Sequence, residues 1–241
     1  MEYFWYTSDN IPKGLGFSHF DGFHLAWLLA GAAVIFLCCL LYRKMKEEQR
    51  SVYRKAMAVL LIADELFLVI PMIVMGVFRA AYLPFELCSI NLFLIAWHAW
   101  KPSRTLGAYL YTVCIPGALA AMLFPSWTKL PALNFVQIHS FTLHILLVMY
   151  PVLLLAAGEL KPRLRDVPRC LGLLVALAGI ALILNLLLDT NFMFLMRVSK
   201  GNPLYIFEQA WGNHLLGFPV LIGAIVIVLY APIEIYYKLK R

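Results

Sequence analysis

Cysteine and histidine side chains lie inside strongly apolar stretches of this 241-residue chain. Cys88 is in the segment LPFELCSIN, and His139 and His144 are in the segment QIHSFTLHILL. A thiolate is a strong nucleophile near neutral pH, and a histidine within hydrogen-bond distance can take the thiol proton. Ionisable groups are costly inside a bilayer, so each is a candidate for function. These residues indicate an activated thiol nucleophile, with either His139 or His144 as the base.

Other polar residues of the apolar stretches could support this chemistry. The set consists of Glu65, Asn91, Asn185, Asp189, Asn191 and His214. Asparagine amides could donate hydrogen bonds to a developing oxyanion, and Glu65 or Asp189 could orient a histidine. Helical spacing places Asn91 on the same face as Cys88. His139 lies about 140° around a helix from His144, so the two histidines are not expected to act as one pair.

The composition predicts an all-α, polytopic membrane protein. Hydrophobic residues make up 63% of the chain, charged residues make up 14%, and the mean hydropathy is +0.81. Runs of about 20 apolar residues are long enough to span a bilayer as helices. Seven such spans are predicted, over residues 24–42, 56–78, 83–100, 105–124, 133–157, 170–188 and 211–236. We therefore expect an N-terminal tail over 1–23 and a single seven-helix membrane domain over 24–241.

The basic residues predict the orientation of these spans. Fifteen of the 20 Lys and Arg residues fall on one side when the loops are counted alternately. The positive-inside rule then places the N-terminus outside and the C-terminus in the cytoplasm, and the expected location is the cell membrane. In this orientation most of the candidate site residues lie toward the outer side, which predicts one cavity that opens to the outer leaflet.

Several other classes of function are disfavoured. The basic residues do not form an aromatic-interleaved patch of the kind that binds nucleic acid. The five cysteines have neither CxxC nor zinc-site spacing, so no cofactor, metal or disulfide framework is predicted. A metal site made of Cys88, His139, His144 and Glu86 is a lesser alternative. Membrane phospholipids are the expected partners, no soluble partner is evident, and the oligomeric state is left open.

Three motifs, in order, resemble one family of small integral membrane proteins. They are LPFELC at the start of the third span, SFTLHILLVMYP in the fifth and TNFMFL after the sixth. The family includes the bacterial YwaF-like proteins and the vertebrate transmembrane protein 164, and the resemblance covers about residues 56–235. The chain departs from the family pattern at Phe85, Glu86 and Phe192, which bears on lipid specificity more than on the fold.

The resemblance implies a function that agrees with the residue chemistry. The vertebrate member is described as an acyltransferase that moves a fatty acyl chain between phospholipids, and its proposed cysteine and histidine match Cys88 and His144. The expected function is therefore cysteine-dependent acyl transfer, or hydrolysis, on phospholipids. Two alternatives stay open. One is a transporter or channel that uses Asp64, Glu65 and the histidines, and the other is a seven-span lipid-binding protein without catalysis.

Overall fold

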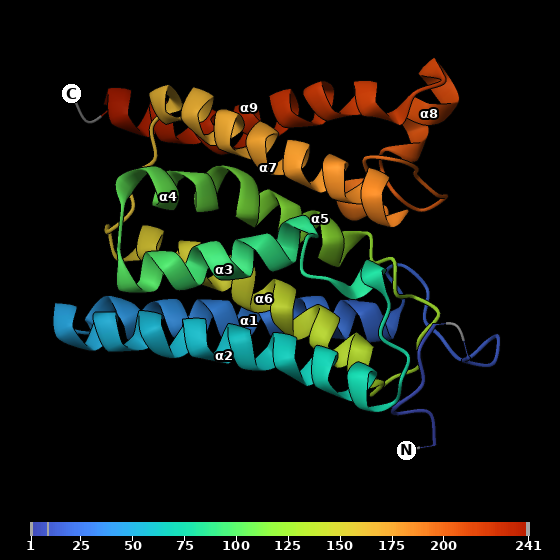
Figure 1. Ribbon diagram of the computed structural model, residues 1–241. Helices are drawn as coiled ribbons and strands as arrows, with labels where there is room; N and C mark the ends of the chain where they lie inside the picture. Colours follow the sequence, from blue (N-terminus) through green and yellow to red (C-terminus); the bar gives the residue numbers. More distant parts are fainter. Residues whose placement is uncertain (1, 9, 240–241) are drawn as a thin grey trace.

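The computed structural model is a bundle of helices that run back and forth between two ends (Figure 1). It describes residues 2–8 and 10–239, with the backbone alone for 236–238, and this part of the chain contains no β-strand. The longer helices are α1 (Gly22–Lys44), α2 (Glu47–Val74), α3 (Leu87–Trp100), α5 (Ile115–Leu123), α6 (Phe135–Ala156), α7 (Val167–Leu188) and α9 (Gly217–Leu239). The shorter helices are α4 (Arg104–Tyr109) and α8 (Tyr205–Trp211).

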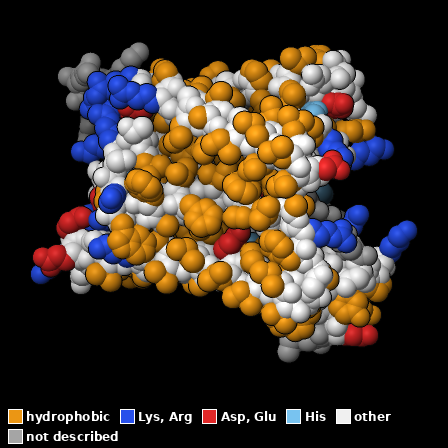
Figure 2. Space-filling model, viewed as in Figure 1, with side chains coloured by type: hydrophobic (Ala, Val, Ile, Leu, Met, Phe, Trp, Pro, Cys, Tyr) orange, Lys and Arg blue, Asp and Glu red, His pale blue; other side chains and the backbone are white. Residues whose placement is uncertain are grey.

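Seven helical segments are long and apolar enough to cross a membrane, as the sequence predicts. They are Gly22–Lys44, Glu47–Val74, Ala80–Trp100, Arg104–Leu123, Phe135–Ala156, Leu164–Leu188 and His214–Ile235. Figure 2 shows hydrophobic side chains over the middle of the viewed face, with a small patch of Asp or Glu among them and with Lys and Arg side chains toward its two ends. The end that carries the N-terminal tail is called the tail end below. The opposite end, where α2, α4 and α7 begin, is called the basic end.

Helix α6 and the α4–α5 segment form the centre of the bundle. The spans Phe135–Ala156 and Arg104–Leu123 bury 61% and 67% of their most apolar windows, against 11–28% for the other five spans. Helix α6 packs against α1, α2, α3 and α5. Polar side chains of α6 therefore face other helices, where they need hydrogen-bond partners.

The second span begins earlier than the sequence indicates. Helix α2 starts at Glu47, not near residue 56, because its polar first turns are bonded to neighbouring elements. The buried Arg54 guanidinium donates to Glu159 beyond α6 at 2.5 Å, to Glu47 at 3.0 Å and to the Tyr42 hydroxyl at 3.2 Å. These bonds stabilise the buried guanidinium charge, so the helix can begin in a polar segment that lies before the apolar run. The apolar pattern alone does not show that this polar segment is helical.

The fourth span is not a regular α-helix. A π-helical turn over Leu110–Cys114 joins α4 to α5, directly before Pro116, which has no N–H to donate. This turn also holds α9 in place. The Tyr111 hydroxyl donates to the Leu229 carbonyl at 2.7 Å, and the hydroxyls of Thr112 and Tyr230 are 2.6 Å apart.

Candidate functional site

Cys88 and His144 meet where α3 crosses the centre of α6. The Cys88 Sγ lies 3.1 Å from His144 Nε2. Cys88 is the second residue of α3 and is partly exposed, whereas His144 is buried in the middle of α6. The structure thus pairs the candidate cysteine with His144 rather than with His139.

The surroundings of His144 fix its tautomer. Its Nδ1 is within hydrogen-bond distance of the Ser140 carbonyl one turn earlier in α6. A carbonyl oxygen only accepts, so Nδ1 carries the proton and donates it to this bond. The lone pair of Nε2 therefore faces the Cys88 thiol, which is the arrangement that general-base catalysis needs. The Ser140 carbonyl takes the orienting role that a carboxylate has in many triads.

The first turn of α3 provides backbone N–H groups beside the thiol. Glu86 is the N-cap residue of α3, and among the described residues no side chain caps this helix. The Glu86 carboxylate instead accepts a hydrogen bond from the Met193 N–H at 2.8 Å. The N-terminal N–H groups of a helix have no acceptor within the helix, and they favour negative charge placed next to them. Cys88 therefore lies in the first turn of α3, beside N–H groups that have no acceptor within the helix.

An aromatic stack covers the other side of the imidazole. The Trp127 ring stacks on His144 with centroids 5.4 Å apart and an interplanar angle of 22°. Phe141 packs edge-on against Trp127, and Trp27 of α1 stacks on Phe141 at 4.9 Å. The Trp127 Nε1–H is buried and has no hydrogen-bond partner in the described structure. A buried, unpaired donor next to the Cys88–His144 pair is available to a ligand oxygen.

Two buried amides near the pair also have unpaired atoms. Gln137 is 0% exposed, and neither its Oε1 nor its Nε2 has a partner among the described groups. It lies on the α6 face of His144, two turns closer to the tail end, as the helical spacing predicts. Asn91, which follows Cys88 on α3, has an unpaired and buried Oδ1. Unpaired buried polar atoms are rare and each needs an explanation, and a polar ligand would provide it.

His139 belongs to a second polar cluster between α2, α3 and α6. Its Nδ1 lies 3.1 Å from an Asp64 carboxylate oxygen, and its Nε2 lies 3.9 Å from Glu65. The Ser89 hydroxyl donates to Glu65 at 3.4 Å, and the Thr142 hydroxyl donates to Asp64 at 2.8 Å. The hydrogen bond that orients His139 is the one between its Nδ1 and the Asp64 carbonyl, at 3.0 Å, and Glu65 lies near His139 without a hydrogen bond to either histidine. Because Ser89 follows Cys88, this cluster lies directly behind the first turn of α3.

The remaining predicted site residues hold the segment between α7 and α9. The buried Asn185 side chain bonds Phe192 through both its N–H and its carbonyl, and it accepts from the Thr190 hydroxyl. Asn191 accepts from the N–H groups of residues 196 and 197. Asp189 is exposed and ends α7 in a left-handed conformation with φ 49°. These three residues stabilise the turn after α7, and the structure does not bring them to the Cys88 thiol.

His214 also fastens this segment. Its Nε2 lies 2.9 Å from the Phe194 carbonyl and its Nδ1 lies 3.0 Å from the Glu208 carboxylate, which also accepts the His214 backbone N–H. These hydrogen bonds lower the pKa of the Glu208 carboxyl below its usual value. His214 is thus at the same end of the bundle as Cys88, as the sequence predicts, but its bonds are to the loop.

The metal alternative is not supported by the geometry. Among the described residues, no three His, Cys, Asp or Glu side chains are arranged to hold a metal ion, and Cys88, His139, His144 and Glu86 do not converge on one point. Glu86 is turned toward Met193 and His139 toward α2.

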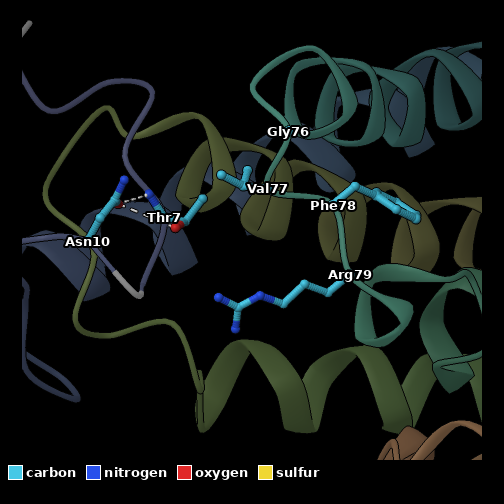
Figure 3. Close-up of a pocket in the computed structure, with 6 residues that line it drawn as sticks. All are labelled: Thr7, Asn10, Gly76, Val77, Phe78 and Arg79. Atoms are coloured by element: carbon cyan, nitrogen blue, oxygen red, sulfur yellow. Dashed lines mark hydrogen bonds between the residues drawn. The ribbon is translucent and has the colours of Figure 1, made fainter.

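A cavity of about 270 Å³ opens at the tail end, between the N-terminal tail and the segment after α2 (Figure 3). Figure 3 shows the Arg79 side chain reaching into this space below Thr7 and Val77. The Thr7 backbone N–H donates to the Asn10 side chain at 2.7 Å. None of the sequence-predicted site residues lines this cavity, so it is separate from the Cys88–His144 pair.

Sequence reasoning missed Trp127. It lies in the loop between α5 and α6, outside any periodic segment, and its contact with His144 depends on the path of that loop. The only sequence feature that could have indicated a role for Trp127 is that it is a tryptophan, whose N–H donor needs a partner when the side chain is buried.

Comparison with known proteins identifies the family. A sequence model of the TMEM164 family matches residues 15–230, which include α1 to α8, the Cys88–His144 pair and most of α9. No curated protein and no solved structure matches the chain. The seven apolar helices agree with a multi-pass integral membrane protein. The chain belongs to the TMEM164 family.

Proposed function

We propose that the protein transfers or hydrolyses the acyl chains of membrane phospholipids through a thioester on Cys88. The observation that carries this proposal is the 3.1 Å contact between the Cys88 thiol and a His144 nitrogen whose lone pair faces it. A partly exposed thiol held against a correctly oriented base is the arrangement that nucleophilic catalysis uses.

The reaction follows from the roles of these two residues. His144 Nε2 takes the thiol proton while the Cys88 sulfur attacks the ester carbonyl carbon. The tetrahedral intermediate then collapses, the ester C–O bond breaks, and His144 returns the proton to the leaving lysophospholipid oxygen. In the second half, His144 takes a proton from an incoming alcohol or water, whose oxygen displaces the sulfur and regenerates the thiol.

Two kinds of donor could stabilise the oxyanion. The backbone N–H groups in the first turn of α3 lie beside the Cys88 sulfur, and no described side chain caps them. The Trp127 indole is stacked on the imidazole that contacts the sulfur, and we assign its unpaired Nε1–H as a second donor to the oxyanion. The unpaired Gln137 amide lies about 10 Å further toward the tail end, where we assign it to the glycerol region of the substrate.

The position of Cys88 in its helix suits a lipid ester. Phospholipid ester bonds lie just below the headgroups, and Cys88 is in the first turn of α3 at the tail end. We assign this end to the outer leaflet of the cell membrane, because the basic residues gather at the other end.

Acyl-enzyme formation tests this function directly. Purified protein in nanodiscs is incubated with phospholipid, and intact mass then reports an adduct that hydroxylamine removes, as it does a thioester. We expect the adduct in the wild type and its absence in Cys88→Ala. Cys114→Ala is the matched control, because Cys114 is a buried thiol that donates to the Leu147 carbonyl and not to a histidine. An unchanged adduct in Cys88→Ala would reject the proposal.

The second candidate function is movement of protons or cations, and the Asp64–His139–Glu65 cluster is the observation that favours it. Two carboxylates around one imidazole inside a membrane are a costly arrangement that proton pathways use. Proton flux into reconstituted vesicles that disappears in Asp64→Asn, with acyl-enzyme formation retained, would support this function.

A further inference from the structure

A cavity of about 400 Å³ lies at the basic end, where α4 and α7 begin side by side (Figure 1). Its lining consists of Arg104 from α4, Arg165 and Asp166 from the 3₁₀ turn Leu164–Asp166, and Arg169 from the first turn of α7. Figure 2 shows Lys and Arg side chains gathered at the corner of the molecule where α7 starts. The cavity is at the opposite end of the bundle from Cys88, so the proposed acyl site does not account for it.

The charges around this cavity are unbalanced. The Asp166 carboxylate accepts from Arg104 Nη2 at 3.2 and 3.3 Å, and it also accepts the Arg163 backbone N–H at 3.1 Å. Arg104 and Asp166 therefore form a fixed pair. Arg165 and Arg169 are exposed, and no described carboxylate pairs with either of them. The lining therefore has a net formal charge of +2.

The chemistry of the lining selects a phosphate group. Guanidinium groups bind phosphate oxygens in pairs of parallel hydrogen bonds, and two of them here have no other described partner. The cavity volume is in the range of sites that hold small ligands. Two unpaired arginines would repel the cationic part of a zwitterionic headgroup such as that of phosphatidylcholine. The anionic headgroup of phosphatidylglycerol has no such cation.

The location selects a lipid as the source of that phosphate. Residues Arg104 and Arg169 lie in the first turns of two membrane-spanning helices, which is the depth of the headgroups. The cytoplasmic leaflet is rich in anionic lipids, and clustered basic residues at its surface attract them. We propose that this cavity binds the phosphate of an anionic phospholipid and that the lipid bridges α4 and α7 at the basic end.

Lipid binding by purified protein in neutral detergent tests the proposal. Native mass spectrometry measures bound phosphatidylglycerol and phosphatidylcholine for the wild type and for Arg165→Gln/Arg169→Gln. We expect the wild type to retain phosphatidylglycerol preferentially, and the double variant to bind it at least about tenfold more weakly, because the loss of even one charge-assisted hydrogen bond corresponds to about this factor. Arg43→Gln/Lys44→Gln is the charge-matched control, because these residues end α1 at the same membrane surface but away from the cavity.

A charge-conserving variant and a competition with inorganic phosphate complete the test. Arg165→Lys/Arg169→Lys keeps the charge and the fold but removes the paired donors, and we expect intermediate affinity. An equal loss in the charge-matched control, or equal retention of phosphatidylcholine by the wild type, would overturn the site in favour of general surface charge. Displacement of the lipid by millimolar inorganic phosphate would overturn the lipid source and assign the cavity to a soluble phosphate.

Discussion

Replacement of His144 by glutamine tests whether this histidine acts as a general base or only packs against its neighbours. A glutamine amide can still contact the Cys88 thiol across the 3.1 Å gap, but it cannot accept the thiol proton. A positioned general base contributes about 10² to 10⁴ in rate, which is about 3 to 5.5 kcal/mol of barrier. Because Nε2 faces the sulfur without an intervening group, we expect His144→Gln to lose a rate factor within this range. Binding of the lipid should change little.

The assay is the single-turnover rate of Cys88 acylation by phospholipid in nanodiscs, followed by intact mass. His139→Gln is the matched control, since His139 is a buried histidine of the same helix that contacts Asp64 and Glu65 instead of the thiol. We expect the control to lower thermal stability while its acylation rate stays within about threefold of the wild type. Acylation by His144→Gln at the wild-type rate would refute the reasoning, and so would an equal rate loss in both variants.

Three further predictions concern other parts of the structure. Trp127→Phe keeps an aromatic ring on His144 but removes the Nε1–H donor. In steady-state turnover of phospholipid, kcat should fall by about 10² while KM stays nearly unchanged. An unchanged kcat would show that Trp127 does not donate to the oxyanion. Asn185→Leu removes three hydrogen bonds of the turn after α7 and should lower stability by about 2–4 kcal/mol in a reversible unfolding assay, whereas a loss under 1 kcal/mol would contradict this role. The lowered pKa of the Glu208 carboxyl means that its bonds to His214 stabilise the loop at neutral pH and are lost as the pH falls through that pKa. Amide hydrogen exchange at the His214 N–H, corrected for its intrinsic pH dependence, should therefore become faster below about pH 4.5 in the wild type. The same exchange should not become faster in Glu208→Gln.

The apolar runs predicted the number of spans correctly, and helical periodicity predicted the faces of α6. The seven apolar runs correspond to seven membrane-length helices, because lipid leaves a backbone no alternative to internal hydrogen bonds. The spacing of Gln137, Phe141 and His144 places them on one face, and His139 is turned toward α2 instead. These features depend only on local geometry, which the sequence contains.

The partner of Cys88 could not be predicted in the same way. Periodicity gives the faces of a helix but not how α6 is rotated against α3, so either histidine was compatible with the spacing. The membrane depth estimated from sequence position led us to expect Asn185 and Asn191 at the same cavity as Cys88, for a related reason. Asparagine side chains close to a helix end bond the nearby backbone, and here they hold the turn after α7. Sequence depth cannot distinguish such a local bond from a cavity.

Glu86 explains how the start of α3 can serve a thiol. An acidic residue at an N-cap position would ordinarily place negative charge on the first N–H groups of the helix. Here the carboxylate is directed to the Met193 N–H at 2.8 Å, and Met193 and Phe194 have left-handed backbones with φ 57° and 55°. Such conformations cost energy in non-glycine residues and persist where the surroundings hold them. The turn after α7 therefore takes up the Glu86 carboxylate, and no described side chain accepts from the first N–H groups of α3. In the proposed reaction these N–H groups would meet the negative charge that develops when Cys88 attacks an ester.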